Sequence, residues 1–199
     1  MRQQSALCWL SLFLVVESTP ATTIVAWGDN TYGQTNVPPG LTNTIAIAQG
    51  GYHGLALEAD GTVAAWGCNF NPVAQSNYVG QATPPAGLSN VVAIAAGYDS
   101  SLALQKEGSV VIWGDSGQTN LPVGLSNVAA ISAGELHSLA LRADGTVAAW
   151  GANTDGQTSV PPGLSNVVAV AAGGFDSVAL LKNEDITQAH CDEVKQRKR

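Results

Sequence analysis

The sequence of 199 residues predicts an all-β fold, a β-propeller-type array of four antiparallel blades. A nine-residue run, ADGTVAAWG, stands at positions 59–67 and again at 143–151. A Trp-Gly pair closes that run, and the pair recurs at Trp27, Trp66, Trp113 and Trp150. Each unit also carries a Pro- and Gly-rich turn and short apolar segments that one unit cannot bury alone. Such units must stack, and radial stacking gives a propeller.

The units are constant in length when they are counted from a Gly-Gln pair to the next Trp-Gly pair. They cover residues 33–66, 80–113, 117–150 and, in part, 156–182. All variation in length therefore lies between Trp-Gly and the following Gly-Gln. Residues 24–28, IVAWG, have the pattern of a final blade strand, so we expect that they could complete the fourth unit and close a ring. An open arc, a homodimer, a truncated fragment of a longer propeller and a true four-bladed ring are the alternatives.

Within a unit, the order of elements is the same each time. A run such as VVAIAAG (91–97) is rich in Ala and β-branched residues, which predicts a strand buried on both faces. The segment SLALRADGTVAAWG (138–151) predicts an alternating strand, a turn at Asp144-Gly145 and a last strand. A weaker fourth strand is expected near the Gly-Gln pair. We expect the four Trp side chains to fill the space between neighbouring blades.

The charge of the repeat region excludes one class of partner. Residues 22–182 hold ten acidic and three basic side chains, which argues against a nucleic-acid partner.

Residues 1–21 have the pattern of a signal peptide, with Arg2, an apolar segment from Ala6 to Val16 and small residues after it. We therefore expect a secreted or periplasmic protein with no membrane span after signal removal. A buried N-terminal helix or a short anchor is the alternative.

Residues 183–199 do not follow the repeat and form a charged tail that ends in KQRKR. This short basic cluster at the end of the chain is best explained as a solvated end. Removal of the signal segment would leave two cysteines, Cys68 and Cys191, which is too few for a disulfide framework. Whether these two cysteines pair stays open.

The segment AGELHSLALRADGTVAAWGANTDGQ (133–157) resembles the regulator of chromosome condensation repeat family. The resemblance covers about residues 24–182, and GQTNVPPGL (33–41) is most similar to the bacterial branch that includes propeller-shaped β-lactamase inhibitor proteins. Family members usually close seven blades, and four are present here. The resemblance implies a protein-binding scaffold. The eukaryotic founder of the family implies the alternative, guanine-nucleotide exchange on a small GTPase.

The units differ from one another mainly at one face of the expected propeller. In an antiparallel blade the loops after Ala-Gly and after Trp-Gly share one face, and the Asp-Gly and Pro-Gly turns share the other. Variable loops on a rigid scaffold usually carry binding, and aromatic side chains beside Asp and His are typical of a protein interface. Inhibitor-type relatives contact their target through the same two sets of loops. The candidate contact residues are Tyr32, Tyr52, His53, Phe70, Tyr78, Tyr98, Asp99, Asp115, His137, Asp155, Phe175 and Asp176.

Structural roles compete with binding at some of these positions. Tyr52, Leu136 and Phe175 align in the repeat and could instead plug the ends of the blades, and His53 and His137 align as structural hydrogen-bonding groups. The sequence has no G-x-S-x-G, Walker, H-E-x-x-H or C-x-x-C motif. We therefore expect no enzymatic activity, no metal site and no cofactor.

Overall fold

The computed structural model describes residues 21–70, 79–115 and 117–182, and shows an all-β chain of four antiparallel sheets, one for each predicted blade. Tyr78, the signal segment up to residue 20 and the tail 183–199 lie outside the described residues. The sheets are β1 (Thr44–Gln49), β2 (His53–Glu58) and β3 (Val63–Gly67); β4 (Val91–Ala96), β5 (Ser100–Gln105) and β6 (Val110–Gly114); β7 (Val128–Ala133), β8 (His137–Arg142) and β9 (Val147–Gly151); and β10 (Val167–Ala172) with β11 (Ser177–Leu181).

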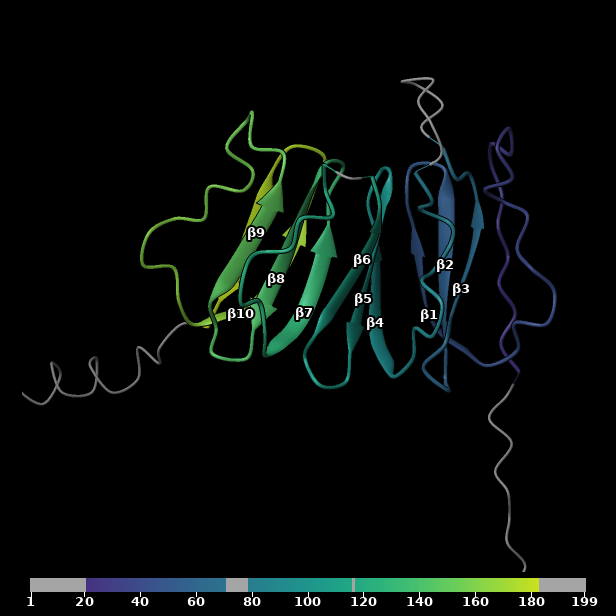
Figure 1. Cartoon of the computed structure of the whole chain (residues 1–199), viewed down its shortest axis with the longest axis horizontal. Coiled ribbons are helices and arrows are strands. Elements are labelled where there is room, and N and C mark those ends of the chain that lie inside the picture. Colours follow the sequence, from purple (N-terminus) through teal and green to yellow (C-terminus); the bar gives the residue numbers. More distant parts are fainter. Residues whose placement is uncertain (1–20, 71–78, 116, 183–199) are drawn as a thin grey trace, which may run out of the picture.

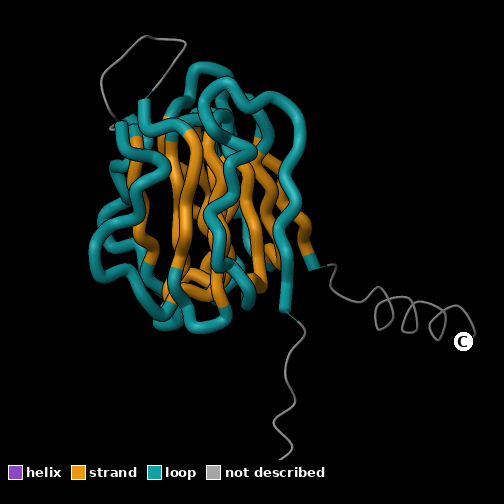
Figure 2. The backbone as a smooth tube through the Cα atoms, turned by 90° about the vertical axis from the view of Figure 1, so that its right-hand side faces the viewer, coloured by secondary structure: helices purple, strands orange, loops and turns teal. Residues whose placement is uncertain are grey.

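The four blades stand side by side in chain order (Figure 1). The antiparallel strands are aligned along a common axis, and the connecting loops gather at the two edges where the strands end (Figure 2). The N-terminal segment and the last blade lie at opposite ends of the array (Figure 1). The described chain is thus an open row of blades rather than a closed ring.

Each blade is a meander in which the second strand lies between the first and the third. The hairpin turns at Gly61, Gly108 and Gly145 have φ of 82°, 83° and 80°, the left-handed conformation that glycine adopts without strain. These turns are the ones that the Asp-Gly and Glu-Gly pairs predict. The turn also reaches the next blade, because the Gly61 carbonyl accepts a 3.1 Å bond from the Val91 N–H.

The predicted fourth strand near each Gly-Gln pair is wrong for the described residues, where these stretches are turns and irregular segments. Prolines follow the Gly-Gln pair in each unit, at Pro38, Pro84, Pro122 and Pro161 among others. Proline has no N–H to contribute to a ladder, so a regular strand cannot continue through these positions.

The burial of the strands also differs from the sequence prediction. The first strand of a blade is only partly buried, with Val92 of β4 exposed, while β2, β5 and β8 are buried on both faces. The reason is the strand order. A middle strand such as β5 has a neighbour on each side in its own sheet and a blade on each side of that sheet, whereas the first strand is an edge.

Two of the four repeat Trp side chains, Trp113 and Trp150, pack between neighbouring blades. Trp113 packs with Leu55 and Leu57 of the preceding blade, and Trp150 packs with Leu102 and Leu104 in the same way. The indole Nε1 of Trp66, Trp113 and Trp150 donates to the carbonyl of Gln34, Gln81 and Gln118, at 2.9, 2.9 and 3.1 Å.

Trp27 is the exception, because its side chain is exposed. Residues 24–28 form no strand in the structure, and they lie beside β1 rather than beside β11. The expected closure of the last blade by this segment of the same chain is therefore not what the structure shows.

Candidate functional site

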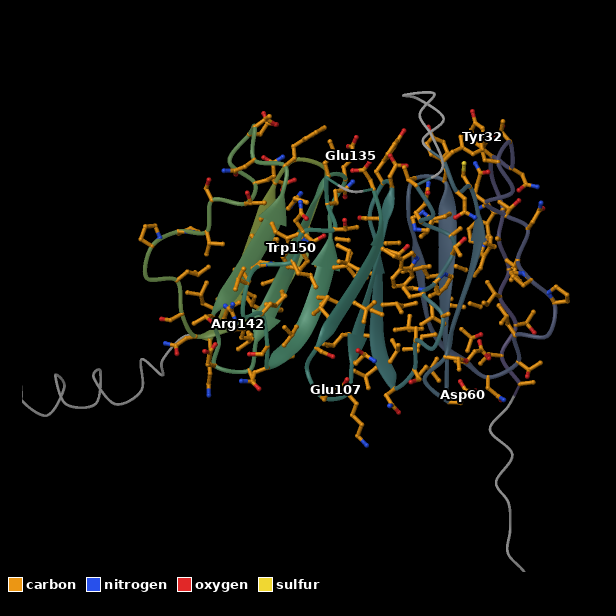
Figure 3. The ribbon with its side chains drawn as sticks, viewed as in Figure 1. Tyr32, Asp60, Glu107, Glu135, Arg142 and Trp150 are labelled. Carbon is orange, nitrogen blue, oxygen red and sulfur yellow. The ribbon has the colours of Figure 1, made fainter. Side chains whose placement is uncertain are left out.

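The loops separate onto two faces as the strand alternation predicts. Tyr32 and Glu135 lie at one edge of the array, and Asp60, Glu107 and Arg142 lie toward the opposite edge (Figure 3). We call the first edge the upper face. It carries the loops 50–52, 97–99, 134–136 and 173–176 together with the connections that follow the Trp-Gly pairs. The opposite edge, with the Asp-Gly turns, is the lower face.

Four of the predicted contact residues form one aromatic cluster on the upper face. The ring of Tyr52 is 5.2 Å from that of Tyr32 and 5.3 Å from that of Tyr98, and Phe70 is 5.9 Å from Tyr32. All three contacts are edge-to-face, the geometry that aromatic quadrupoles favour. Phe70 is exposed, and the three tyrosines are half-buried. The cluster brings together loops from three successive units.

Hydrogen bonding fixes the orientation of the tyrosines. The Tyr98 hydroxyl donates to the Tyr52 hydroxyl at 2.9 Å. This bond, with burial and the nearby Tyr52, Asp99 and Glu135 groups, raises the pKa of Tyr98 to about 12. Tyr98 therefore stays a neutral donor throughout the physiological range, and the two rings present a fixed surface. Tyr98 also lies over Gly51, where an added Cβ would come within 2.8 Å of the ring.

Buried polar groups support this cluster from below. The Gln81 side-chain amide donates to the Phe70 carbonyl at 3.2 Å and to Asp99 Oδ1 at 3.4 Å. Asp99 is buried, so it supports the cluster and does not face solvent. The Cys68 thiol, also buried, donates to the Phe70 carbonyl at 3.1 Å. The backbone beneath Phe70 is therefore held on two sides.

The remaining predicted residues do not join the cluster. Asp115 Oδ1 accepts the Gly117 N–H at 2.8 Å, which closes a local turn. Asp155 is also part of a turn, since its N–H donates to Gln157 Oε1 at 2.9 Å. Phe175 and Asp176 are exposed and line a hollow on the last blade instead.

The two aligned histidines have structural roles. His53 Nε2 lies 2.8 Å from Ser101 Oγ of the next blade, and that hydroxyl donates to the Gln81 carbonyl at 2.8 Å. The Ser101 hydroxyl hydrogen is thus used in the bond to the Gln81 carbonyl, so the imidazole of His53 carries its proton on Nε2 and donates it to Ser101 Oγ. His53 is fully buried, and burial lowers its pKa to about 4. A neutral buried imidazole that links two blades is a stabilising group and not a contact residue.

The same arrangement repeats at the other end of the array. His137 Nε2 lies 2.9 Å from Ser177 Oγ, which donates to the Gln157 carbonyl at 2.8 Å. Burial lowers the pKa of His137, and Asp176 partly opposes that shift. We call each set of histidine, serine and glutamine carbonyl a blade relay.

The sequence prediction missed the four glutamines of the Gly-Gln pairs. Their signal was present, because a glutamine follows glycine at the start of every unit. The side chains are buried and their carbonyls accept the Trp or Ser donors described above; the residues are Gln34, Gln81, Gln118 and Gln157. They position the upper loops.

The described residues hold neither a cluster of metal-binding side chains nor a helix suited to cross a membrane. Among these residues, no three His, Cys, Asp or Glu side chains gather as a metal site would need. The same part of the chain also has no helix of the length and apolar character that crossing a bilayer takes.

Comparison with known proteins identifies the repeat and the fold. A model of the regulator of chromosome condensation (RCC1) repeat matches residues 45–71, 91–118 and 128–157. No curated protein matches the chain. Prp20p from Saccharomyces cerevisiae, solved in a study of its binding to Gsp1p and histones, is similar with a TM-score of 0.62 and 21% identity, over 85% of this chain and 54% of that one.

Two further structures give the same result at slightly higher identity. Yeast RCC1 (Prp20) bound to Kap60 is 26% identical, with a TM-score of 0.56 over 70% of this chain and 42% of that one. The ectodomain of the Physcomitrella patens receptor kinase CR4 is 27% identical, with a TM-score of 0.61 over 79% and 43%. The chain thus spans about half the length of the solved structures that it matches. Its four sheets resemble the blades of these RCC1-type β-propellers.

Proposed function

We propose that this chain is a non-enzymatic scaffold that binds a protein partner through its upper face, centred on the aromatic cluster. The observation that carries the proposal is the contact of Tyr32, Tyr52, Tyr98 and Phe70 across three units. Rigid aromatic side chains lose little entropy on binding and are frequent hot spots. Here they stand on loops that the blades hold in place.

The distribution of charge supports a partner with a basic surface. Among the described residues, the upper face presents acidic side chains and no basic one to solvent; the acidic residues are Asp29, Asp115, Glu135, Asp155 and Asp176. The three described cations, Lys106, Arg142 and Lys182, all stand at the lower ends of strands or in lower turns. An apolar centre with an acidic rim favours a complementary patch that is apolar in the middle and basic around it.

A double variant, Tyr98→Ala with Phe70→Ala, tests the face. The amount of each captured protein is compared among three chains: the wild type, the double variant and a lower-face control, Lys106→Ala with Glu107→Ala. We expect a set of proteins that is kept by the control and lost by the double variant, and whose binding weakens as salt is raised. Equal recovery by all three chains would contradict the proposal.

The inhibitor-type branch supplies one defined target. If the chain acts in that way, adding it to a β-lactamase slows hydrolysis of a chromogenic substrate, and the Tyr98 and Phe70 double variant does not. Undiminished hydrolysis with the wild-type chain removes the inhibitor role and leaves the binding scaffold to be tested by capture.

Nucleotide exchange on a small GTPase is the second candidate. The match of three stretches to the RCC1 repeat and the likeness to yeast RCC1 favour it. A nucleotide-release assay with Gsp1p separates the two, because a scaffold without exchange activity leaves the release rate unchanged.

We also propose that the protein is secreted. The signal-like residues 1–21 support this, and so does the likeness to a receptor-kinase ectodomain. Expression in a secreting host followed by N-terminal sequencing tests it. Cleavage near Ala21 is the expected result, and retention of Met1 in the cell fraction would contradict it.

A further inference from the structure

The two ends of the array leave uncovered the positions that the inner blades bury. Trp27 is 85% exposed, whereas its repeat counterparts Trp66, Trp113 and Trp150 are 6–8% exposed. At the other end, Val178 and Leu180 of β11 are 60% and 63% exposed. Their counterparts in the inner blades, Leu55, Leu57, Leu102, Leu104, Leu139 and Leu141, are 0–5% exposed. Both ends therefore show apolar surface of a kind that this fold otherwise covers with a neighbouring strand.

The N-terminal segment already occupies the place of a third blade strand. Its sequence TIVAWG (23–28) has the pattern of TVAAWG (62–67), which forms β3. Where β3 meets the next blade, the Val91 N–H donates to the Gly61 carbonyl at 3.1 Å. At the matching position, the Thr44 N–H donates to Thr22 Oγ1 at 2.8 Å, and the Thr22 N–H donates to the Thr42 carbonyl at 2.8 Å.

Segment 22–28 therefore lies against the first blade as β3 lies against the second. Among the described residues, no first and second strand accompany segment 22–28 to form a complete blade with it.

The last blade has a first and a second strand but no third strand among the described residues. Its described part is β10 and β11 alone, and a hollow of about 430 Å³ lies over them, lined by Val170, Val178 and Leu181 among others. The Gln157 carbonyl lies at this hollow and accepts the Ser177 hydroxyl.

The counterpart carbonyl, that of Gln81, accepts both a serine hydroxyl and the indole of Trp113. The Gln157 carbonyl thus has capacity for an indole N–H, and none reaches it from the described residues.

We propose that segment 22–28 of a second copy of this chain pairs with β11 and completes the last blade. The register follows from β8 and β9, where Ser138 faces Trp150 and Leu139 faces Ala149. By the repeat, Ser177 faces Trp27 of the second copy, Val178 faces Ala26 and Leu180 faces Ile24. The Trp27 indole then enters the hollow and donates to the Gln157 carbonyl.

The exchange is reciprocal, so two copies bury both of their uncovered ends in one closed dimer. Segment 22–28 and β11 of the same chain lie at opposite ends of the array, which is why the donor is a second copy (Figure 1). This dimer uses the ends of the row and leaves the aromatic cluster of the upper face accessible, so it does not depend on the proposed partner binding.

Complementation between variants tests the proposal. Light scattering across a concentration series is expected to give a dimer for the wild-type chain and for the lower-face control Val123→Asp. Trp27→Ala removes the donor and Leu180→Asp disrupts the acceptor, and each is expected to weaken the dimer by about 30-fold or more, the effect of losing a buried Trp anchor.

Mixing the two variants distinguishes this dimer from any other. A mixed pair keeps one junction in which both partners are intact, so the mixture forms more dimer than either variant alone. A monomeric wild-type chain, a dimer that neither variant weakens, or a mixture no more dimeric than its components would each overturn the proposal.

A cross-link provides a measurement that does not depend on stability. The double variant Ala26→Cys with Val178→Cys is expected to form a covalent dimer under oxidising conditions, because these positions face each other across the predicted junction. Each single variant serves as a control and stays uncross-linked. A cross-link within one chain, or a dimer that appears only when residues 183–199 are deleted, would mean that the chain covers β11 itself and would overturn the proposal.

Discussion

The junction between the first and second blades is built differently from the junction between the second and third. In the first junction, His53 reaches Ser101 of the next blade and completes a blade relay. In the second, the position of the histidine is held by Ser100, and the aligned Ser138 hydroxyl is buried with no hydrogen-bond partner among the described residues. One residue type in the repeat thus decides whether two blades are linked through their side chains.

The space left by the missing imidazole is filled by another side chain. Ser100 Oγ donates to Gln118 Oε1 at 2.9 Å, so the amide of Gln118 occupies the region next to Gly97. The amide of Gln81, at the first junction, turns instead toward Phe70 and Asp99. The second junction therefore keeps its packing without a histidine because the Gln118 amide takes the place of the imidazole. The Ser138 hydroxyl is then left without a described partner.

Gly50→Ala is expected to cause the largest loss of stability. An added Cβ at Gly50 would collide with the His53 ring and with the Gly97 carbonyl. At Gly97 the nearest atoms are the Ser100 hydroxyl at 2.7 Å and the Gly134 carbonyl at 2.8 Å, and the hydroxyl can rotate away. We expect Gly50→Ala to lower the free energy of unfolding by about 3 kcal/mol or more, and Gly97→Ala by less. Urea unfolding of both variants measures the difference, and equal losses would show that the ring does not restrict this position.

The pH dependence of stability reports on the first junction. Because the pKa of His53 is lowered to about 4, the unfolded chain takes up a proton near pH 6.5 while the folded chain does not. The contribution of His53 is therefore fully present above about pH 6.5 and is lost as the pH falls toward 4, by roughly 3 kcal/mol. The lowered pKa of His137 acts in the same direction. Urea midpoints between pH 8 and pH 4 test this, and His53→Gln, which keeps an N–H donor but does not titrate, is expected to flatten the curve.

The two aligned serines should respond differently to the same substitution. Ser101→Ala leaves the buried His53 Nε2 without an acceptor, which we expect to cost about 2 kcal/mol. Ser138→Ala removes a hydroxyl that has no described partner, so its effect is expected to lie within about 0.5 kcal/mol or to be stabilising. Thermal unfolding of both variants gives the comparison directly. A large loss in Ser138→Ala would mean that this hydroxyl is bonded after all.

Ser100→His should convert the second junction into a copy of the first. The new imidazole would displace the Gln118 amide and give Ser138 a donor, and we expect a gain of about 1 kcal/mol. The same substitution in a Ser138→Ala background is the matched control and should lose that gain. A destabilised Ser100→His variant with intact Ser138 would show that the blades are too close at this junction for a ring.

The repeat predicted most of the fold, and part of the site, because its signals are local. Asp60-Gly61 and its counterparts specify hairpin turns, so strand number and direction followed, and with them the division of loops between two faces. Burial of the first and second strands was predicted in the wrong order, because both are apolar runs and only strand order within the sheet distinguishes them. The prolines after each Gly-Gln pair carried the information that rules out a fourth strand.

The sequence predicted which face carries the candidate site, but it identified only some of the residues that form the site. Tyr32, Tyr52, Phe70 and Tyr98 come from different units, and no local pattern shows that their rings meet. His53 and Asp99 were grouped with them by their place in a loop, yet both point inward. Tyr78 lies outside the described residues, and its place in the site stays a prediction.

The sequence by itself determined the repeat, the turns and the number of blades, since each depends on residues close together in the chain. Only the tertiary structure decided how the blades are joined and which side chains share the upper face. Those features depend on contacts between units, such as His53 with Ser101 and Tyr52 with Tyr98, that are more than forty residues apart. It also decided that Trp27 stands uncovered, because a Trp at the end of the row has the same sequence pattern as one inside it and differs only in what packs against it.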